Sequence, residues 1–233
     1  MTIVNRKHFA SMLEFAMQAT DQQGKLFGVA IAATEEHMHV TGYSDIVLHS
    51  QFMPHNGNTM PAFTLSSDTA RYLAAELRDS TSKDITMIND RNGLQLVDNG
   101  QCVKLPGNQG ITVSVGKVLN GTPKARGEIT RKKLSVYANF PGMDASNAEF
   151  LLMNVQDGVM TFNDSLHQTV ILDDSTPDIN LAVNRSSLLT VLEYQTDSKV
   201  SILFNVQGKI WSSSPLVLRG EDWSVYLTAA VTQ

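Results

Sequence analysis

The sequence of 233 residues lacks several features that define whole classes of protein. Cys102 is its only cysteine, which excludes an intrachain disulfide framework. Its apolar runs are far shorter than the roughly eighteen residues of a membrane-spanning helix, and the N-terminus has no secretory signal pattern. These absences predict a cytoplasmic protein without a membrane partner.

Charge of either sign is also scarce. Charged residues make up 18% of the chain, and the net charge of −5 argues against nucleic acid coating the whole surface. The hydrophobic content of 42% is nevertheless enough for a substantial core. The length suits one large domain or two of ordinary size.

A short amphipathic helix followed by a run of strands recurs four times, about sixty residues apart, as expected of a duplicated βαβββ module. The strand runs are predicted to begin near Phe27, Ile85, Glu149 and Val200. The helices are predicted to begin near Arg6, Ser67, Thr130 and Arg185.

The third of these helices is the least clearly marked, because Val136 and Tyr137 would suit a strand equally well. Asn99-Gly100, Asp157-Gly158 and Gln207-Gly208 predict hairpins within the strand runs. A segment rich in Pro and Gly, at about 106–120, marks a boundary. Two domains are therefore expected, 1–110 and 118–233, with two modules each.

Basic residues gather on or beside the predicted helices, whereas acidic residues cluster elsewhere, as in DDSTPD at 173–178. Basic helices on an acidic protein suit a polyanion bound at one surface, although lysine and arginine are also ordinary residues of solvated helix faces. The candidate DNA-binding residues are Arg6, Lys7, Arg71, Arg78, Lys124, Arg126, Arg131, Lys132, Lys133 and Arg185.

Catalytic signatures are thin. GITVSVGKV has the wrong spacing for a Walker loop, and Val118 stands where a Ser or Thr would bind Mg²⁺. Cys102 beside Val103 is typical of a small core hydrophobe rather than a nucleophile. No catalytic residue and no cofactor are predicted, which favours a binding or scaffolding protein over an enzyme.

Four histidines come close together in the N-terminal half. His37 and His39 could share one strand face, with His49 and His55 nearby in sequence. Metal sites need three or four converging ligands, so ordinary strand histidines are favoured and no metal is predicted.

The C-terminal segment resembles a known family. The order INLAVNRSSLLTVLEYQTDSKVSILFNVQGKIW, then PLVLRGEDWSVYLTAAVTQ, resembles the last domain of the bacterial DNA sliding clamps. AIAATEEHMHVTGYSDIVLHSQF is similar to the family's strands, with Ser44-Asp45 in place of Thr-Asp, and FTLSSDTARYLAAELRD followed by NGLQLVDNGQCVKL resembles the second half of such a domain. The likeness covers most of the chain as pattern and spacing and is least at 107–148.

This resemblance implies an α+β DNA-clamp fold of two similar domains, with helices on one face and antiparallel sheets on the other. Sliding clamps are closed rings of twelve such modules, and the bacterial chain supplies six and works as a dimer. Four modules per chain then imply a homotrimer that encircles duplex DNA without reading its sequence and tethers a polymerase or another DNA enzyme. The alternative is a clamp-fold adaptor or decoy for clamp-binding partners that does not encircle DNA.

The resemblance also implies a partner site, because partners of the family insert a short hydrophobic peptide near the C-terminal tail. Here Ala229-Ala230 stands where bacterial clamps usually have Met-Pro, and Thr232-Gln233 replaces a basic ending. A shallower or differently selective groove is expected. Its candidate residues are Leu216, Val217, Ala229, Ala230 and Val231.

Overall fold

The computed structural model describes residues 1–20, 25–44, 47–90, 93–109, 125–139, 149–163, 165–172, 178–204 and 213–232. The chain divides into two compact units, Met1–Val118 (unit 1) and Leu119–Gln233 (unit 2). No helix in the described part of the chain is long and apolar enough to cross a membrane.

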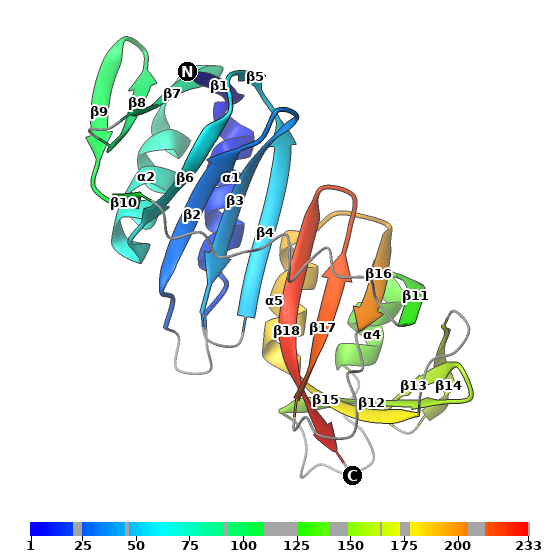
Figure 1. Cartoon of the computed structure of the whole chain (residues 1–233). Coiled ribbons are helices and arrows are strands. Elements are labelled where there is room, and N and C mark those ends of the chain that lie inside the picture. The colour runs from blue at the N-terminus through cyan, green and yellow to red at the C-terminus, as the bar shows by residue number, and fades with distance from the viewer. Residues whose placement is uncertain are drawn as a thin grey trace. The chain divides into compact units, whose positions relative to one another are not determined.

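Unit 1 has two helices among its described residues, α1 (Arg6–Met17) and α2 (Ser67–Asp79) (Figure 1). Its strands are β1 (Thr2–Asn5), β2 (Gly28–Ala33), β3 (His37–Tyr43), β4 (Val47–Pro54), β5 (Asn56–Gly57), β6 (Met60–Leu65), β7 (Asp84–Asp90), β8 (Gly93–Asp98), β9 (Gln101–Leu105) and β10 (Asn108–Gln109).

Two βαβββ modules build unit 1, and they exchange their first strands. The first module runs β1-α1-β2-β3-β4 and the second runs β6-α2-β7-β8-β9. Strand β1 pairs with β7 of the second module, and β6 pairs with β2 of the first. The strand orders are β5-β1-β7-β8-β9 and β10-β6-β2-β3-β4, so each sheet draws strands from both modules.

Unit 2 repeats this plan. The first strand of its third module, β11, pairs with β16 of the fourth module. The first strand of the fourth module, β15, pairs with β12 of the third. The elements are β11 (Ala125–Thr130), α4 (Arg131–Asn139), β12 (Phe150–Gln156), β13 (Val159–Phe162), β14 (Ser165–Ile171), β15 (Ile179–Asn184), α5 (Arg185–Tyr194), β16 (Lys199–Phe204), β17 (Ser213–Arg219) and β18 (Trp223–Thr232).

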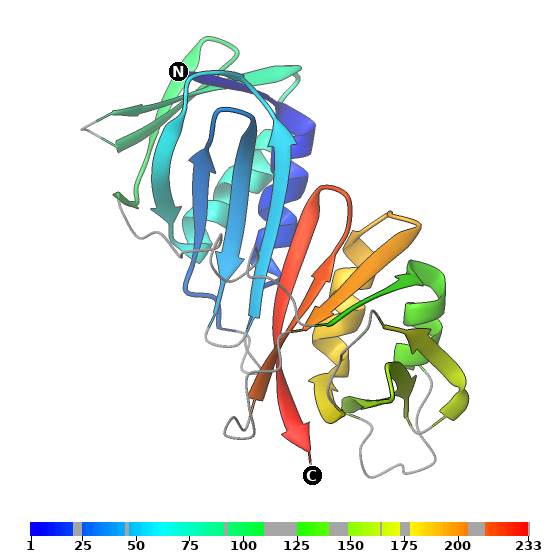
Figure 2. The ribbon, with the colours of Figure 1, turned by 45° about the vertical axis from the view of Figure 1, so that its right-hand side comes forward.

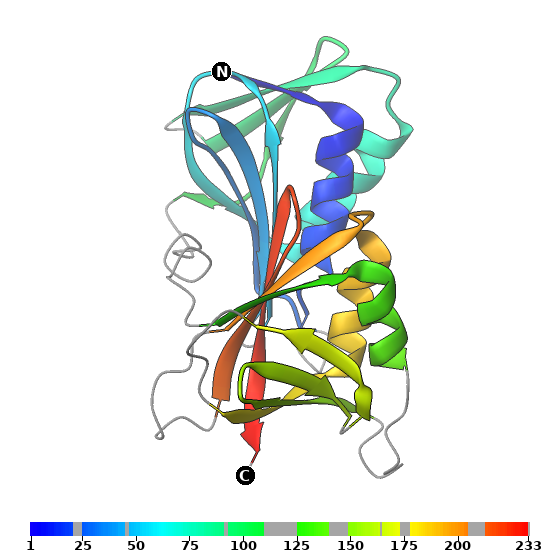
Figure 3. The ribbon, with the colours of Figure 1, turned by 90° about the vertical axis from the view of Figure 1, so that its right-hand side faces the viewer.

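In each unit the two helices lie side by side on one face of a sheet. Figure 2 shows α1 and α2 together behind β2, β3 and β4, and Figure 3 shows α4 and α5 together beside the strands of unit 2. Apolar residues at helical spacing cause this packing, because they form one continuous stripe. In α1 the stripe is Phe9, Met12, Leu13 and Ala16, all fully buried.

The predicted fold class is confirmed, and a helix begins at or next to each of the four predicted positions. The third helix does form as α4, since Leu134 and Ala138 give it a buried stripe. Positive φ angles at Asn99 and Gly100 (48° and 78°) and at Asp157 and Gly158 (50° and 74°) form the two predicted turns. The turn predicted at Gln207-Gly208 lies outside the described residues.

The prediction that Cys102 is a core residue is wrong. Strand β9 is the edge of its sheet, and four of its five residues are exposed, Cys102 and Val103 among them. A strand with a partner on one side only has less cover for its side chains, and an apolar sequence alone does not reveal which strand is at the edge.

Candidate nucleic-acid interface

Three of the four described helices begin with arginine directly after an N-capping residue. Asn5 and Asn184 each accept a hydrogen bond from the backbone three residues ahead, at 3.0 Å. Thr130 accepts one in the same way at 3.3 Å. The repeated pattern is a strand, an Asn or Thr cap, and an arginine at the first helical position.

The first of these arginines, Arg6, does not reach solvent. It is only 4% exposed, and its Nε donates a hydrogen bond to the Ser82 carbonyl at 2.6 Å. Its Nη1 donates to the carbonyls of Leu77 and Arg78, in the last turn of α2. Carbonyls at a helix C-terminus have no partner within the helix and carry partial negative charge, so a guanidinium stabilises them. The prediction that Arg6 contacts DNA is therefore wrong.

Arg131 repeats this arrangement in unit 2. It is half-buried, and its Nη1 donates to the Leu192 carbonyl in the last turn of α5 at 2.9 Å. Arg185 is also half-buried and donates from Nη2 to the Phe150 carbonyl at 3.0 Å. Both guanidinium groups thus hold elements of unit 2 together. The pattern that they share with Arg6, an arginine directly after a capping residue, could have indicated this role.

A second group of the predicted residues is exposed but paired with carboxylates. Exposed ion pairs contribute at most about 1 kcal/mol, so a phosphate could compete for these arginines. Each neighbouring carboxylate, however, offsets one positive charge. The pairs are Arg71 with Asp68 at 3.6 Å, Arg78 with Glu14, and Arg126 with Glu128 at 3.1 Å.

Three lysines remain as exposed cations on the helices. Lys7 follows Arg6 on α1, and Lys132 and Lys133 follow Arg131 on α4. Among the described residues, no carboxylate forms an ion pair with any of the three. Lys124 lies outside the described residues.

Comparison with known proteins agrees with this architecture. No family model and no curated protein sequence matches the chain. Among solved structures, the DNA polymerase III beta subunit of Thermotoga maritima matches with a TM-score of 0.79 and 17% identity, over 100% of this chain and 66% of that chain. The chain has the sliding-clamp fold.

Other clamp structures match over a similar share. The beta chain of Streptococcus pneumoniae matches with a TM-score of 0.73 and 14% identity, over 99% of this chain and 64% of that one. The beta subunit of Caulobacter crescentus matches with a TM-score of 0.76 and 10% identity, over 97% and 64%. The clamp-fold chain thus spans slightly less than two thirds of these proteins.

The clamp fold places the predicted partner-binding residues on β17 and β18. Leu216 is 0% exposed and Val217 is 7% exposed, so both belong to the core of unit 2 rather than to an open groove lining. Their prediction as groove residues is therefore corrected. Ala229, Ala230 and Val231 lie on β18, but their side chains are outside the described part, and their role stays a prediction.

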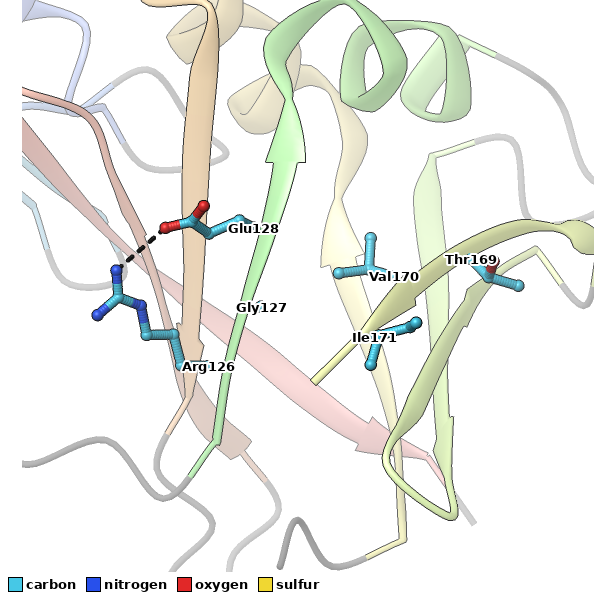
Figure 4. A pocket seen from close by; sticks show the side chains of 6 residues that line it. All are labelled: Arg126, Gly127, Glu128, Thr169, Val170 and Ile171. Carbon is cyan, nitrogen blue, oxygen red and sulfur yellow. Dashed lines mark hydrogen bonds and ion pairs between the residues drawn. The ribbon is translucent and has the colours of Figure 1, made fainter. Parts of the chain in front are cut away.

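A groove of about 510 Å³ lies elsewhere in unit 2, between β11 and β14. Figure 4 shows Arg126 and Glu128 on the same side of β11, joined by their ion pair, opposite Thr169, Val170 and Ile171. Gly127 between them lets the strands approach, because a Cβ there would lie 2.7 Å from the Leu172 side chain. Arg126 therefore belongs to a seam between strands and not to a helix face.

His37 and His39 do share one face of β3, as predicted. Their ring centroids are 6.3 Å apart, and both contact Phe52 on β4. Burial, followed by the nearby His37 and His55, lowers the pKa of His39. Within the described residues no three histidines, cysteines or carboxylates converge as a metal site.

His49 is separate from this group and faces the core. It is 1% exposed, stacks on Phe15 with ring centroids 4.8 Å apart, and its Nδ1 is 3.1 Å from the Phe15 carbonyl. Burial lowers its pKa to about 4, partly offset by this hydrogen bond. His49 is therefore a neutral core residue at physiological pH.

Proposed function

We propose that this chain is a subunit of a DNA sliding clamp, a ring that encircles duplex DNA and holds a polymerase or another DNA enzyme on it. The observation that carries the proposal is the fold. Four βαβββ modules match bacterial clamp subunits over nearly the whole chain. The proposed role is that of a scaffold rather than a catalyst, with enzymes docking through short hydrophobic peptides.

From the number of modules we propose a homotrimer. The resemblance to sliding clamps implies six modules per bacterial chain and twelve per ring, whereas this chain has four and covers 64–66% of such chains. Three copies then supply twelve.

Edge strands support the closure of such a ring. Strand β9 is the edge of its sheet, and Val103 on it is 47% exposed. On β14, Ile171 is 81% exposed. In the described part of the chain, the side of β14 toward β11 is followed only by the isolated bridge between Leu172 and Gly127. Unpaired strand edges with apolar side chains are templates for pairing with another chain.

A sliding ring needs contacts that exchange quickly. Lysine contacts to phosphate oxygens are electrostatic, weaken with salt and carry no base information, so they let a protein move along DNA. The exposed lysines Lys132 and Lys133 on α4 suit this requirement.

Threading tests the proposal without any loading factor. Purified protein is mixed with linear duplex DNA that carries biotin at both ends, streptavidin is added, and bound protein is separated by gel filtration in moderate salt. A closed ring enters over a free end and is then trapped, so retention is expected only when streptavidin is added after the protein. A restriction cut between the ends releases the trapped protein.

The order of addition gives the matched control. Streptavidin added first blocks entry and should abolish retention, whereas a protein that binds the side of the duplex is retained in either order. Equal retention in both orders, or a monomeric mass in solution with no retention, would contradict encirclement. The monomeric result would favour the adaptor or decoy.

A further inference from the structure

Only one of the two units has an excess of positive charge on its described helices. In unit 1, α1 and α2 carry four basic and four acidic residues, so their formal charges cancel. In unit 2, α4 and α5 carry four basic residues and one acidic residue, Glu193, which leaves +3. Arg6 is buried, which lowers the accessible charge of the unit 1 pair to −1. Arg131 and Arg185 are half-buried and donate to carbonyls, and without them the unit 2 pair keeps +1, from Lys132, Lys133 and Glu193. Two helix pairs of the same topology therefore offer different surfaces to a polyanion.

Ion pairs increase this contrast. On the unit 1 helices, Arg71 and Arg78 are both engaged by carboxylates, and a phosphate would have to displace these acids. On α4, Lys132 and Lys133 are exposed, and no described carboxylate forms an ion pair with them. Lys7 is the sole lysine on the unit 1 helices.

The lysines of α4 also stand where they do not help their own helix. Lys132 and Lys133 lie in its first turn, which holds no acidic residue. The N-terminus of a helix carries partial positive charge, so cations there are disfavoured and an anion is favoured. A phosphate between these side chains would therefore relieve repulsion that the folded chain leaves in place.

We infer that the chain holds DNA phosphates through one patch, Lys132 and Lys133 on α4, while the helix face of unit 1 contributes little. This inference rests on the proposed function and narrows its DNA contact from four helices to one. In a trimer it places three equivalent patches around the duplex, with weakly charged surfaces between them.

A matched pair of charge reversals tests the inference. K132E/K133E alters α4, and K7E/R71E alters two exposed basic residues of unit 1 by the same formal charge. Both full-length variants are titrated with a fluorescent duplex of mixed sequence at several salt concentrations. The logarithm of the affinity falls linearly with the logarithm of the salt concentration, and each lost phosphate contact makes this slope about 0.9 less steep.

K132E/K133E is expected to weaken binding at least tenfold at low salt and to reduce the slope, while K7E/R71E changes affinity less than about threefold. Folding does not confuse this result, because glutamates in the first turn of α4 suit the helix dipole and should leave the melting temperature unchanged or raised. An equal loss from K7E/R71E would overturn the inference and leave the clamp proposal standing. A wild-type chain that neither binds nor threads onto duplex DNA would contradict both.

Discussion

Replacing Arg6 with methionine is expected to destabilise unit 1 without affecting a DNA contact. The side chain is buried and donates hydrogen bonds to three carbonyls, those of Leu77, Arg78 and Ser82. Methionine occupies a similar length but donates nothing, so these carbonyls at the end of α2 lose their partner. Lys7→Met is the matched control, because Lys7 is the next residue on α1 and its side chain is exposed.

The magnitude follows from the contacts. A buried hydrogen bond from a charged donor contributes about 1.5–3 kcal/mol, and the one to the Ser82 carbonyl, at 2.6 Å, is well formed. The one to the Arg78 carbonyl, at 3.3 Å, is weaker. Part of the lost stability is recovered, because burying methionine does not carry the desolvation cost of burying a guanidinium. We expect a net decrease of about 3 kcal/mol in the free energy of unfolding for R6M, and at most about 0.5 kcal/mol for K7M.

Urea denaturation with two probes measures this change. Both tryptophans, Trp211 and Trp223, belong to unit 2, so their fluorescence follows that unit, whereas circular dichroism follows the whole chain. A loss of 3 kcal/mol lowers the urea midpoint of unit 1 by about 1.5 M, with the fluorescence transition less affected. If R6M were as stable as K7M and instead bound DNA less tightly, the guanidinium would be a phosphate ligand and its assignment to the fold would be refuted.

Two further predictions concern the packing of α1 on its sheet. His49 has a folded-state pKa of about 4 against 6.5 when unfolded, so its contribution to stability is complete above pH 6.5 and is lost as the pH falls toward 4. The loss amounts to about 3 kcal/mol, and H49Q should lack this part of the pH dependence in urea titrations between pH 7 and 4. If H49Q kept the wild-type slope, another group would be responsible. Gly42→Ala places a Cβ onto the Ala16 carbonyl and should cost more than about 3 kcal/mol. Gly100→Ala meets nothing within 4 Å and should cost only about 1 kcal/mol for its φ of +78°. Similar melting temperatures for these two variants would contradict the close approach of α1 and β3.

Local patterns explain why so much of the fold could be predicted. The stripe of α1 and the turns at Asn99-Gly100 and Asp157-Gly158 depend on residues close together in the chain, and the structure shows them as expected. The exchange of first strands could not be predicted in this way, because the pairing of β1 with β7 joins segments about eighty residues apart and local periodicity is silent about partners.

The candidate site was harder to predict because one residue type has two uses. Arg6 and Lys7 are neighbours with the same charge, but successive helical residues point about 100° apart, so one is buried against α2 and the other is exposed. A prediction from charge alone therefore assigned both residues to the DNA contact. Likewise, the alternation of β17 could not show that both Leu216 and Val217 are covered, since this depends on what packs on each face.

The exchange of first strands also sets the order in which a newly made chain can fold. Strand β1 leaves the ribosome before its partner residues Asp84–Met87, which follow about eighty residues later. At 5–20 residues per second, β1 is made roughly 4–16 seconds before its partner strand β7. A chain cut between the two modules would leave each half with a first strand whose partner lies in the other half, so the two modules are expected to fold only together.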